Sequence, residues 1–301
     1  YVVAGGSGYL GEHLARRLMS KGEEVLVVDR YPPRSGAPHV VHDLREPLTL
    51  DVEVPVIYHL AANPSVRATM EESRARFEEE LKVTLNVAEL ARTTDAELLV
   101  YVSSPAVYGD APTPTPESAP LRPISFHGLN KALSEGVVDF YARNYGIRSL
   151  IIRLTNVAGG AMTHGVIVDF IRRLRANPRE LEIYGDGTQG RSYLYIDDAL
   201  RAFEVLEERR AAGVYNAGND DWVSVNEVAS IVSSTMGLEP RIKYNRCTME
   251  VREAIGVGWP GDIRLVFPDS SKLKSLGWAP SMGSREAVAR AVRDILGGSP
   301  S

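Results

Sequence analysis

Short apolar runs alternate with amphipathic stretches through the first half of the chain. In the stretch at residues 9–21, Leu10, Leu14 and Leu18 recur at the spacing of a helix that buries one face. Further helices are predicted at residues 68–92 and 126–145, and Val-, Ile- and Leu-rich strands at residues 1–5, 24–29, 54–62, 96–104 and 148–156. Continuous apolar strands alternating with helices predict an α/β fold with a doubly wound parallel sheet covered on both faces.

The pattern changes at about residue 159 to shorter, mixed elements. Helices are predicted at residues 166–176, 197–209, 224–236 and 284–296, and strands at residues 181–184 and 192–196. We therefore expect a first domain over residues 1–158 and a smaller C-terminal α/β lobe over residues 159–301, with some elements exchanged between them. The Pro-rich segment 110–123 is predicted to be an ordered surface loop at the carboxyl edge of the sheet.

Composition excludes several classes of function. The net charge of −5 comes without a block rich in Lys and Arg, so neither nucleic acid nor an anionic membrane surface is expected as a partner. The single cysteine excludes an intramolecular disulfide and a cysteine-based zinc cluster, which fits a reducing, cytoplasmic location. The histidines show no metal-binding spacing, and no serine-hydrolase motif is present, so no metal site is predicted.

A glycine-rich turn joins the first predicted strand to the first helix. Gly5, Gly8 and Gly11 form G-x-x-G-x-x-G, which lets the backbone approach a pyrophosphate at the N-terminus of the helix. Asp29 ends the second strand, where a carboxylate can accept from an adenosine ribose hydroxyl. This context predicts dinucleotide binding over residues 1–158. Asp29 favours NAD over NADP, whereas the adjacent Arg30 weakens that preference.

Several motifs occur together and in order: "GGSGYLG", "VSSPAVYGD", "RLTNVAGG" and "YGDGTQGRSYLYIDDA". With the helix that carries Lys131, the chain resembles the extended short-chain dehydrogenases/reductases over nearly its whole length. Within that group it looks like the UDP-galactose (UDP-glucose) 4-epimerases of the compact archaeal type. The resemblance implies a Rossmann fold, NAD as cofactor, a UDP-hexose substrate and a homodimer formed by the helices at residues 68–92 and 126–145. The reaction that it implies interconverts UDP-galactose and UDP-glucose by transient oxidation at C4.

The resemblance also assigns the catalytic positions, and one of them is unusual. In this family a Tyr four residues before the Lys takes the proton of the sugar 4-hydroxyl, the Lys holds the nicotinamide ribose, and a Ser or Thr binds the same hydroxyl. Here these positions hold His127, Lys131 and Ser104. A neutral imidazole becomes cationic on taking a proton, and two like charges about 4 Å apart cost about 4 kcal/mol at an effective dielectric of about 20. That corresponds to roughly a thousandfold in rate.

We therefore expect binding to be intact and chemistry to be slow or altered. A catalytically inactive or ligand-trapping protein on the same scaffold is the alternative, and a reductase that releases NADH is a third reading. Sister families that dehydrate or decarboxylate sugar nucleotides carry acids just after the catalytic Ser or Thr, whereas this chain has Pro105 and Ala106.

A further departure from the family pattern is Glu80, which stands where relatives usually have Asn. If buried it would pair with Lys131 or another cation, and if exposed it would be part of a solvated helix face.

The remaining site residues follow from the motifs. Besides Lys131, cofactor contacts are expected at Gly5, Ser7, Gly8, Tyr9, Leu10, Asp29, Arg30, Asp43, Leu44, Leu60, Ala61, Ala62, Asn63, Ser103 and Thr155. Substrate contacts are expected at Asn156, Gly165, Val166, Tyr184, Arg191 and Asp262. An Arg suits bidentate recognition of phosphate. The sequence leaves open whether the sugar carries a hydroxyl or an N-acetyl group at C2.

Overall fold

A computed structural model describes residues 1–62, 70–245, 258 and 261–298. The chain divides into two compact units that alternate along the sequence. Unit 1 comprises residues 1–104, 126–153 and 206–215, and unit 2 comprises residues 105–125, 154–205 and 216–301. Among the described residues, no helix is both long enough and apolar enough to cross a membrane.

Unit 1 is built on a seven-stranded sheet with the order β11-β6-β5-β4-β1-β2-β3. The strands are β1 (Val2–Ala4), β2 (Leu26–Asp29), β3 (His39–Val41), β4 (Val56–His59), β5 (Leu98–Ser103), β6 (Arg148–Leu154) and β11 (Gly213–Ala217). The pairs β1–β2, β1–β4, β4–β5 and β5–β6 are parallel, with Val3 opposite both Val27 and Tyr58. Strands β2 and β3 extend the sheet on one side of β1, and β4, β5 and β6 extend it on the other, so the predicted doubly wound α/β fold is confirmed.

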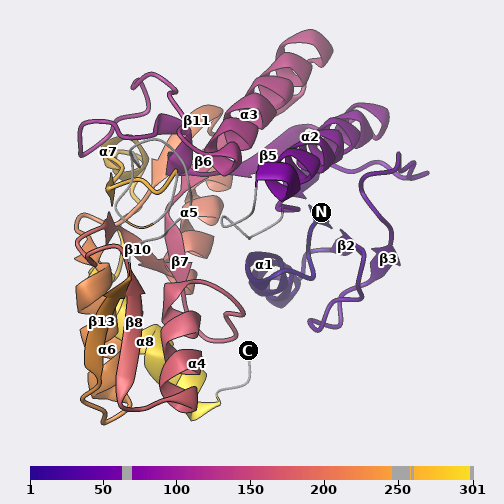
Figure 1. The fold of residues 1–301 in the computed structure, drawn as a ribbon. Helices are drawn as coiled ribbons and strands as arrows, with labels where there is room; N and C mark the ends of the chain where they lie inside the picture. Colours follow the sequence, from indigo (N-terminus) through magenta and orange to yellow (C-terminus); the bar gives the residue numbers. More distant parts are fainter. Residues whose placement is uncertain (63–69, 246–257, 259–260, 299–301) are drawn as a thin grey trace. The chain divides into compact units, whose positions relative to one another are not determined.

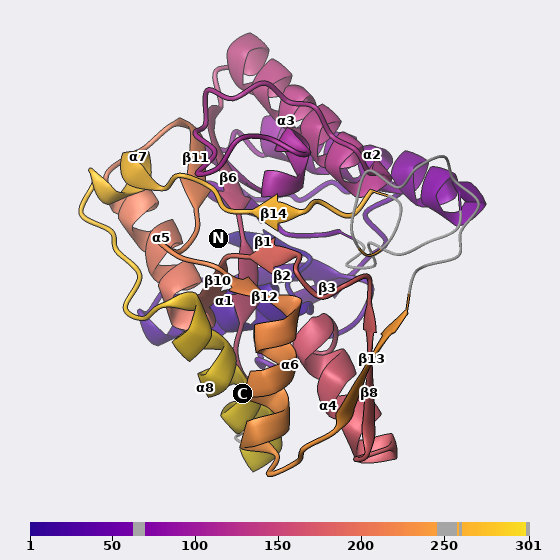
Figure 2. The ribbon, with the colours of Figure 1, turned by 60° about the vertical axis from the view of Figure 1, so that its left-hand side comes forward.

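Three helices of unit 1 connect these strands: α1 (Tyr9–Ser20), α2 (Met70–Thr93) and α3 (Phe126–Tyr145). Because right-handed crossovers on either side of β1 run in opposite directions, α1 covers one face of the sheet and α2 and α3 cover the other. Helices α2 and α3 lie side by side (Figures 1 and 2). The core beneath them includes Val87, Leu90, Leu99, Val138 and Ile151, all almost fully buried.

Unit 2 consists of shorter elements. Its helices are η1 (Pro105–Tyr108), α4 (Val166–Ala176), most of α5 (Ile196–Glu208), α6 (Val225–Thr235), α7 (Ser271–Lys274) and α8 (Ser284–Gly297). In the part of unit 2 that the structure describes, the strands form three small sheets: β7 (Asn156–Ala158) with β10 (Tyr193–Tyr195), β8 (Glu180–Tyr184) with β13 (Arg241–Asn245), and β9 (Gly190–Arg191) between β12 (Val223–Ser224) and β14 (Leu265–Val266). Figure 2 shows β8 and β13 as a long parallel pair beside α4 and α6.

Local chemistry explains where several elements begin and end. Ser224 and Glu227 form a capping box at the start of α6, in which each side chain accepts from the other residue's backbone N–H. The single strand predicted at residues 148–156 is divided into β6 and β7 at Thr155, whose backbone N–H donates to the carbonyl of Ala217 and whose hydroxyl donates to that of Ser192. Within the Pro-rich segment, the backbone N–H of Thr115 donates to the carbonyl of Phe267 at 2.9 Å.

Candidate functional site

The glycine turn between β1 and α1 is packed too tightly for other residues. Gly5 has φ of 85°, and a Cβ there would lie 2.4 Å from the backbone nitrogen of Ala61. A Cβ on Gly11 would lie 2.4 Å from the carbonyl oxygen of Gly5. Gly8 occupies the N-cap position of α1 and has no side chain with which to cap it. The first N–H groups of α1 and the positive end of its dipole therefore suit an anion such as a pyrophosphate.

Asp29 is held against this turn. One carboxylate oxygen accepts from the backbone N–H of Ser7 at 3.1 Å, and the other accepts from that of Tyr31 at 3.3 Å. The hydroxyl of Ser7 in turn donates to the carbonyl of Tyr31 at 2.6 Å. A carboxylate oxygen has two lone pairs, so each still has capacity for a ribose hydroxyl. Arg30, next to Asp29, is exposed.

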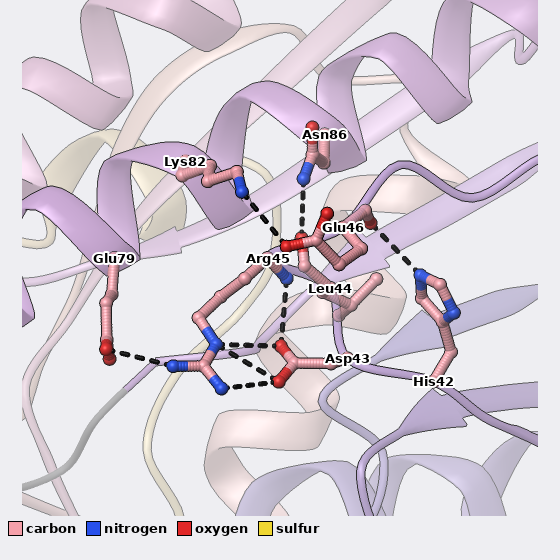
Figure 3. Close-up of polar contacts among 8 residues, drawn as sticks. All are labelled: His42, Asp43, Leu44, Arg45, Glu46, Glu79, Lys82 and Asn86. Atoms are coloured by element: carbon pink, nitrogen blue, oxygen red, sulfur yellow. Dashed lines mark hydrogen bonds and ion pairs between the residues drawn. The ribbon is translucent and has the colours of Figure 1, made fainter.

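The loop after β3 carries the predicted adenine contacts Asp43 and Leu44, and Figure 3 shows how it is fixed to α2. The guanidinium of Arg45 donates to both carboxylate oxygens of Asp43, at 2.6 to 3.1 Å, and also to Glu79 at 2.9 Å. The hydrogen bonds from Arg45 lower the pKa of Asp43 to about 2. The side-chain amide of Asn86 donates to the carbonyl of Leu44 at 2.8 Å.

The sequence does not predict these contacts between the loop after β3 and α2. Arg45 and Glu79 lie 34 residues apart, and no motif links them. A second ion pair holds the same segment to the same helix, between Lys82 and Glu46 at 3.1 Å. The loop is thus held both by its own Asp43–Arg45 ion pair and by its contacts with α2.

A buried ion pair lies beside the end of β5. Arg153 on β6 donates to both carboxylate oxygens of Glu135 on α3, at 2.9 and 2.7 Å, and both side chains are almost fully buried. The hydroxyl of Ser103 donates to the same carboxylate at 2.5 Å. Ser103 was predicted to contact the cofactor; in the structure its hydroxyl links β5 to α3, and the cofactor contact stays a prediction.

Lys131 lies on α3, one turn before Glu135. Its ammonium donates to the carbonyl of Val102 at 2.9 Å and lies 4.9 Å from the centre of the Tyr101 ring. Burial lowers the pKa of Lys131 to about 8, while the carboxylates of Glu80 and, less strongly, Glu135 oppose that change.

His127 stands one turn before Lys131 and on the same face of α3. It is half-buried, and its pKa falls to about 4 because burial and then the charge of Lys131 disfavour the imidazolium. Ser104, also half-buried, directly follows β5, the strand whose Val102 carbonyl accepts from Lys131. The three predicted catalytic residues therefore all belong to unit 1.

A chain of buried polar groups connects α2 to α3 behind these residues. The hydroxyl of Thr84 lies 3.1 Å from both the His59 Nε2 atom and the Ser134 hydroxyl, and Ser134 donates to Asn130 at 3.2 Å. Burial lowers the pKa of His59 to about 3, with a further contribution from Lys131, so this imidazole is neutral at pH 7. None of these links was visible in the sequence, since they join residues from three separate elements.

The other predicted cofactor residues that the structure describes lie in the glycine turn, in the first turn of α1, directly after β4 and directly after β6. Ser7, Tyr9 and Leu10 are half-buried in the glycine turn and first turn of α1, and the backbone N–H of Leu60 donates to Ala4 at 2.8 Å. Ala61 is half-buried and Ala62 exposed, whereas Asn63 lies outside the described residues. Thr155 belongs to unit 2.

The predicted substrate residues all lie in unit 2. Arg191 forms an ion pair with the buried carboxylate of Asp262 and donates to the carbonyl of Gly190 at 2.7 Å. Tyr184, at the end of β8, has the guanidinium of Arg173 5.0 Å from its ring centre. The remaining predicted contacts are Asn156, which is exposed, and Gly165 and Val166, at the start of α4. Among the described residues, no group of three or more potential metal ligands comes together.

Comparison with known proteins places this site in context. Residues 1–218 match the NAD dependent epimerase/dehydratase family. A crystal structure of a UDP-galactose 4-epimerase is 37% identical, with a TM-score of 0.87 and coverage of 99% of both chains. A putative UDP-glucose 4-epimerase of Methanocaldococcus jannaschii is 28% identical over 97% of this chain and 96% of its own length. UDP-glucuronic acid decarboxylase 1 of Arabidopsis thaliana is 29% identical over 98% of this chain and 69% of its own length.

These relatives act on UDP-sugars by more than one reaction, so the finer activity is a separate question. The matched family covers well over half of the chain and includes the glycine turn, Asp29, His127 and Lys131. The predicted family and its cofactor, NAD, are thereby confirmed. The chain belongs to the NAD dependent epimerase/dehydratase family.

Proposed function

We propose that this protein is an NAD-dependent 4-epimerase that interconverts UDP-galactose and UDP-glucose, with turnover reduced by His127. The observation that carries the proposal is the set formed by Ser104, His127 and Lys131 at the end of β5 and on one face of α3. Pro105 and Ala106 support epimerisation over decarboxylation or dehydration, because neither side chain can transfer a proton. The similarity to the UDP-galactose 4-epimerase structure, at 37% identity, points the same way.

The residues of unit 1 suit NAD. The glycine turn would take its pyrophosphate, Asp29 its adenosine ribose and Lys131 its nicotinamide ribose. When bound, NAD supplies a hydride acceptor that takes the C4 hydrogen of the sugar and later returns it. The chain's own task is then to remove the proton of the 4-hydroxyl and to give it back.

His127 is a weak base for that task. Its pKa of about 4 means that the imidazole is neutral and ready to accept a proton at pH 7, but holds it poorly. A pKa about 3 below the operating pH corresponds to a proton affinity roughly a thousandfold below the best match for general acid–base catalysis. Lys131, with a pKa of about 8, stays mostly cationic at pH 7 and can donate to a ribose hydroxyl.

In unit 2, Arg191 and Asp262 would contact phosphate or ribose, Tyr184 would pack on uracil, and Asn156, Gly165 and Val166 would contact the diphosphate or sugar. A guanidinium already oriented by a buried carboxylate loses little freedom on binding phosphate. The turnover assay decides whether the sugar of the substrate carries a hydroxyl or an N-acetyl group at C2.

A homodimer is part of the proposal. Leu129, Leu133 and Phe140 on α3, and Leu85 on α2, are exposed large apolar side chains on two helices that pack together. A partner that covers them with the same two helices would remove this apolar surface from water. A cytoplasmic location is proposed from the single cysteine.

Turnover of UDP-galactose by purified protein with its NAD tests the function. The sugar nucleotides are followed by NMR for the wild type, His127→Tyr and His127→Phe. We expect slow epimerisation by the wild type, up to about a thousandfold faster turnover by His127→Tyr, and none by His127→Phe. Equal rates for the wild type and His127→Tyr contradict the electrostatic reasoning, and carbon dioxide release from UDP-glucuronic acid contradicts epimerisation.

The low pKa of His127 also supports a second candidate, a protein that binds NAD and UDP-sugar without turning them over. It is distinguished by tight binding of both ligands in calorimetry together with the absence of epimerisation by the wild type. Stoichiometric release of NADH would instead identify a reductase.

A further inference from the structure

Two adjacent residues of β5 contact the ammonium of Lys131. The ammonium donates to the backbone carbonyl of Val102 at 2.9 Å, and it lies over the ring of Tyr101, 4.9 Å from the ring centre. The face of an aromatic ring carries partial negative charge and attracts a cation that lies within about 6 Å of its centre. A lysine ammonium has three N–H donors. Because Val102 and Tyr101 occupy two sides of it, β5 determines the direction in which the ammonium can donate further.

The ring of Tyr101 is itself held by residues of other elements. Tyr101 is only 2% exposed, and the ring of His59 on β4 lies 5.1 Å from it. The Nε2 atom of His59 lies 3.1 Å from the hydroxyl of Thr84 on α2. Burial and, less strongly, the charge of Lys131 lower the pKa of His59 to about 3, so the imidazole adds no second cation beside the ring at pH 7. These contacts keep the ring beneath the ammonium.

The charges around Lys131 do not fully offset its burial. Burial lowers the pKa of Lys131 to about 8, although the carboxylates of Glu80 on α2, which is half-buried, and, less strongly, of Glu135 on α3 raise it. Glu135 is shared with the buried guanidinium of Arg153 on β6. The imidazole of His127, whose pKa falls to about 4 through burial, is neutral at pH 7. The contacts with β5 therefore replace part of the hydration that the buried ammonium has lost.

We infer that Tyr101 is a positioning residue that acts through Lys131. Its ring face, together with the carbonyl of Val102, holds the ammonium charged and oriented so that a remaining N–H can donate to a hydroxyl of the nicotinamide ribose. This inference rests on the proposed function, since it concerns the role of Lys131 toward that ribose. Burial raises the pKa of the Tyr101 phenol, so the phenol stays neutral and takes no part in proton transfer.

The magnitude follows from the burial of the contact. Attraction between a cation and an aromatic ring is strongest where water is excluded, and Lys131 is only 8% exposed. We expect loss of the ring to weaken the proton affinity of Lys131 about tenfold, which lowers its pKa by about 1. At pH 8 about half of the wild-type lysine would then be charged but only about a tenth of the lysine in a variant without the ring, whereas at pH 6 nearly all of both would be charged.

The first test titrates Lys131 directly. The purified protein is labelled with 13Cε-lysine, the Lys131 signal is assigned with Lys131→Met, and its pKa is measured in the wild type, Tyr101→Phe, Tyr101→Leu and Leu99→Ala. Leu99 lies two residues before Tyr101 on the same face of β5 and is 1% exposed, so Leu99→Ala is the control for a cavity in the same core. We expect the tenfold weaker proton affinity in Tyr101→Leu only. An unchanged pKa in Tyr101→Leu, or an equal fall in Leu99→Ala, overturns the inference.

A second substitution separates the charge of the ring face from its shape. Pentafluorophenylalanine is close to phenylalanine in size, but its ring face carries partial positive charge. With pentafluorophenylalanine in place of Tyr101, we expect the proton affinity of Lys131 to be at least about tenfold weaker than in Tyr101→Phe. Equal pKa values in these two proteins overturn the inference, even where Tyr101→Leu does not fold.

The third test measures the consequence for NAD. We expect Tyr101→Leu to bind NAD in calorimetry nearly as tightly as the wild type at pH 6 and about fivefold more weakly at pH 8, because fewer of its lysines are then charged. Tyr101→Phe should match the wild type at both pH values. An equal loss of affinity at both pH values indicates a purely structural role for Tyr101 and overturns the inference. Absence of UDP-galactose turnover by the wild type contradicts the proposed function, and the lysine titrations then decide the inference alone.

Discussion

Replacing Arg153 with Met is expected to destabilise unit 1 strongly. Arg153 and Glu135 form a two-point ion pair in which the side chains are only 5% and 6% exposed. Removing the guanidinium leaves a buried carboxylate that keeps the hydroxyl of Ser103 but loses the cation that contacts it directly. Breaking a buried pair in this way typically costs about 3 to 5 kcal/mol, because the remaining charge stays out of water.

A matched control is available on the same helix. Arg143 and Asp139 form an ion pair at 2.7 Å, but their side chains are 72% and 51% exposed. Arg143→Met removes a cation from this pair at a cost of less than about 1 kcal/mol, since water replaces the lost contact. A double variant, Glu135→Met with Arg153→Met, removes both buried charges and is expected to be more stable than Arg153→Met alone.

Hydrogen exchange followed by mass spectrometry is the suitable assay. Peptides from α3, β5 and β6 report the opening free energy of the elements that the pair joins. Tryptophan fluorescence does not serve, because Trp222 and Trp278, the tryptophans in the described part of the chain, belong to unit 2. Equal loss of protection in Arg153→Met and Arg143→Met would refute the reasoning that burial makes this pair important.

Three further predictions concern the glycine turn, the catalytic lysine and the dimer. Gly5→Ala places a Cβ 2.4 Å from the Ala61 nitrogen at φ of 85°, and we expect it to weaken NAD binding at least tenfold in calorimetry. The control is Gly22→Ala, which has the same φ but open space around it and should leave NAD binding unchanged. Burial lowers the pKa of Lys131 from 10.5 to about 8. The free-energy cost of burying its charged ammonium is therefore fully present below pH 8 and disappears as pH rises toward 10.5. Stability in urea should therefore rise by up to about 3 kcal/mol over that window, and Lys131→Met should lack the rise. Leu133→Arg should convert a dimer to a monomer in sedimentation, and persistence of the dimer would exclude α3 from the interface.

The sequence predicts those parts of the fold in which one local signal is strong. The spacing of apolar residues predicts α3 and α4 with the same first and last residues as in the structure. The glycine turn is recognisable in the sequence because its tight packing against Ala61 requires glycine. Strand β3 was missed because it has only three residues, none of them buried. One long strand was predicted where Thr155 ends β6, since the partners of Thr155 lie at Ser192 and Ala217 and leave no mark nearby.

The candidate site likewise contains residues that the sequence indicates and residues that it does not. Motifs indicate Gly5, Asp29, His127 and Lys131, because each sits at a fixed place relative to a strand or helix end. The groups that hold these residues in place could not be predicted, since they depend on packing between distant segments. Arg153 is 18 residues from Glu135, and Thr84 is 50 residues from Ser134. From the sequence alone, a charged or polar residue in a helix cannot be distinguished from an ordinary surface residue, because the residue that it contacts in space is not known.

The balance of charge around Lys131 shows why such neighbours matter. Lys131 and Arg153 are cationic and Glu80 and Glu135 are anionic, so the group as a whole is neutral at pH 7 while His127 carries no proton. A proton on His127 then adds one positive charge to a neutral cluster. Without Glu80 the pKa of Lys131, which is about 8 in its presence, would fall further, and a smaller fraction of the lysine would be cationic at pH 7. The charge state of Lys131 therefore depends on the packing of α2 against α3 as well as on its own place in α3.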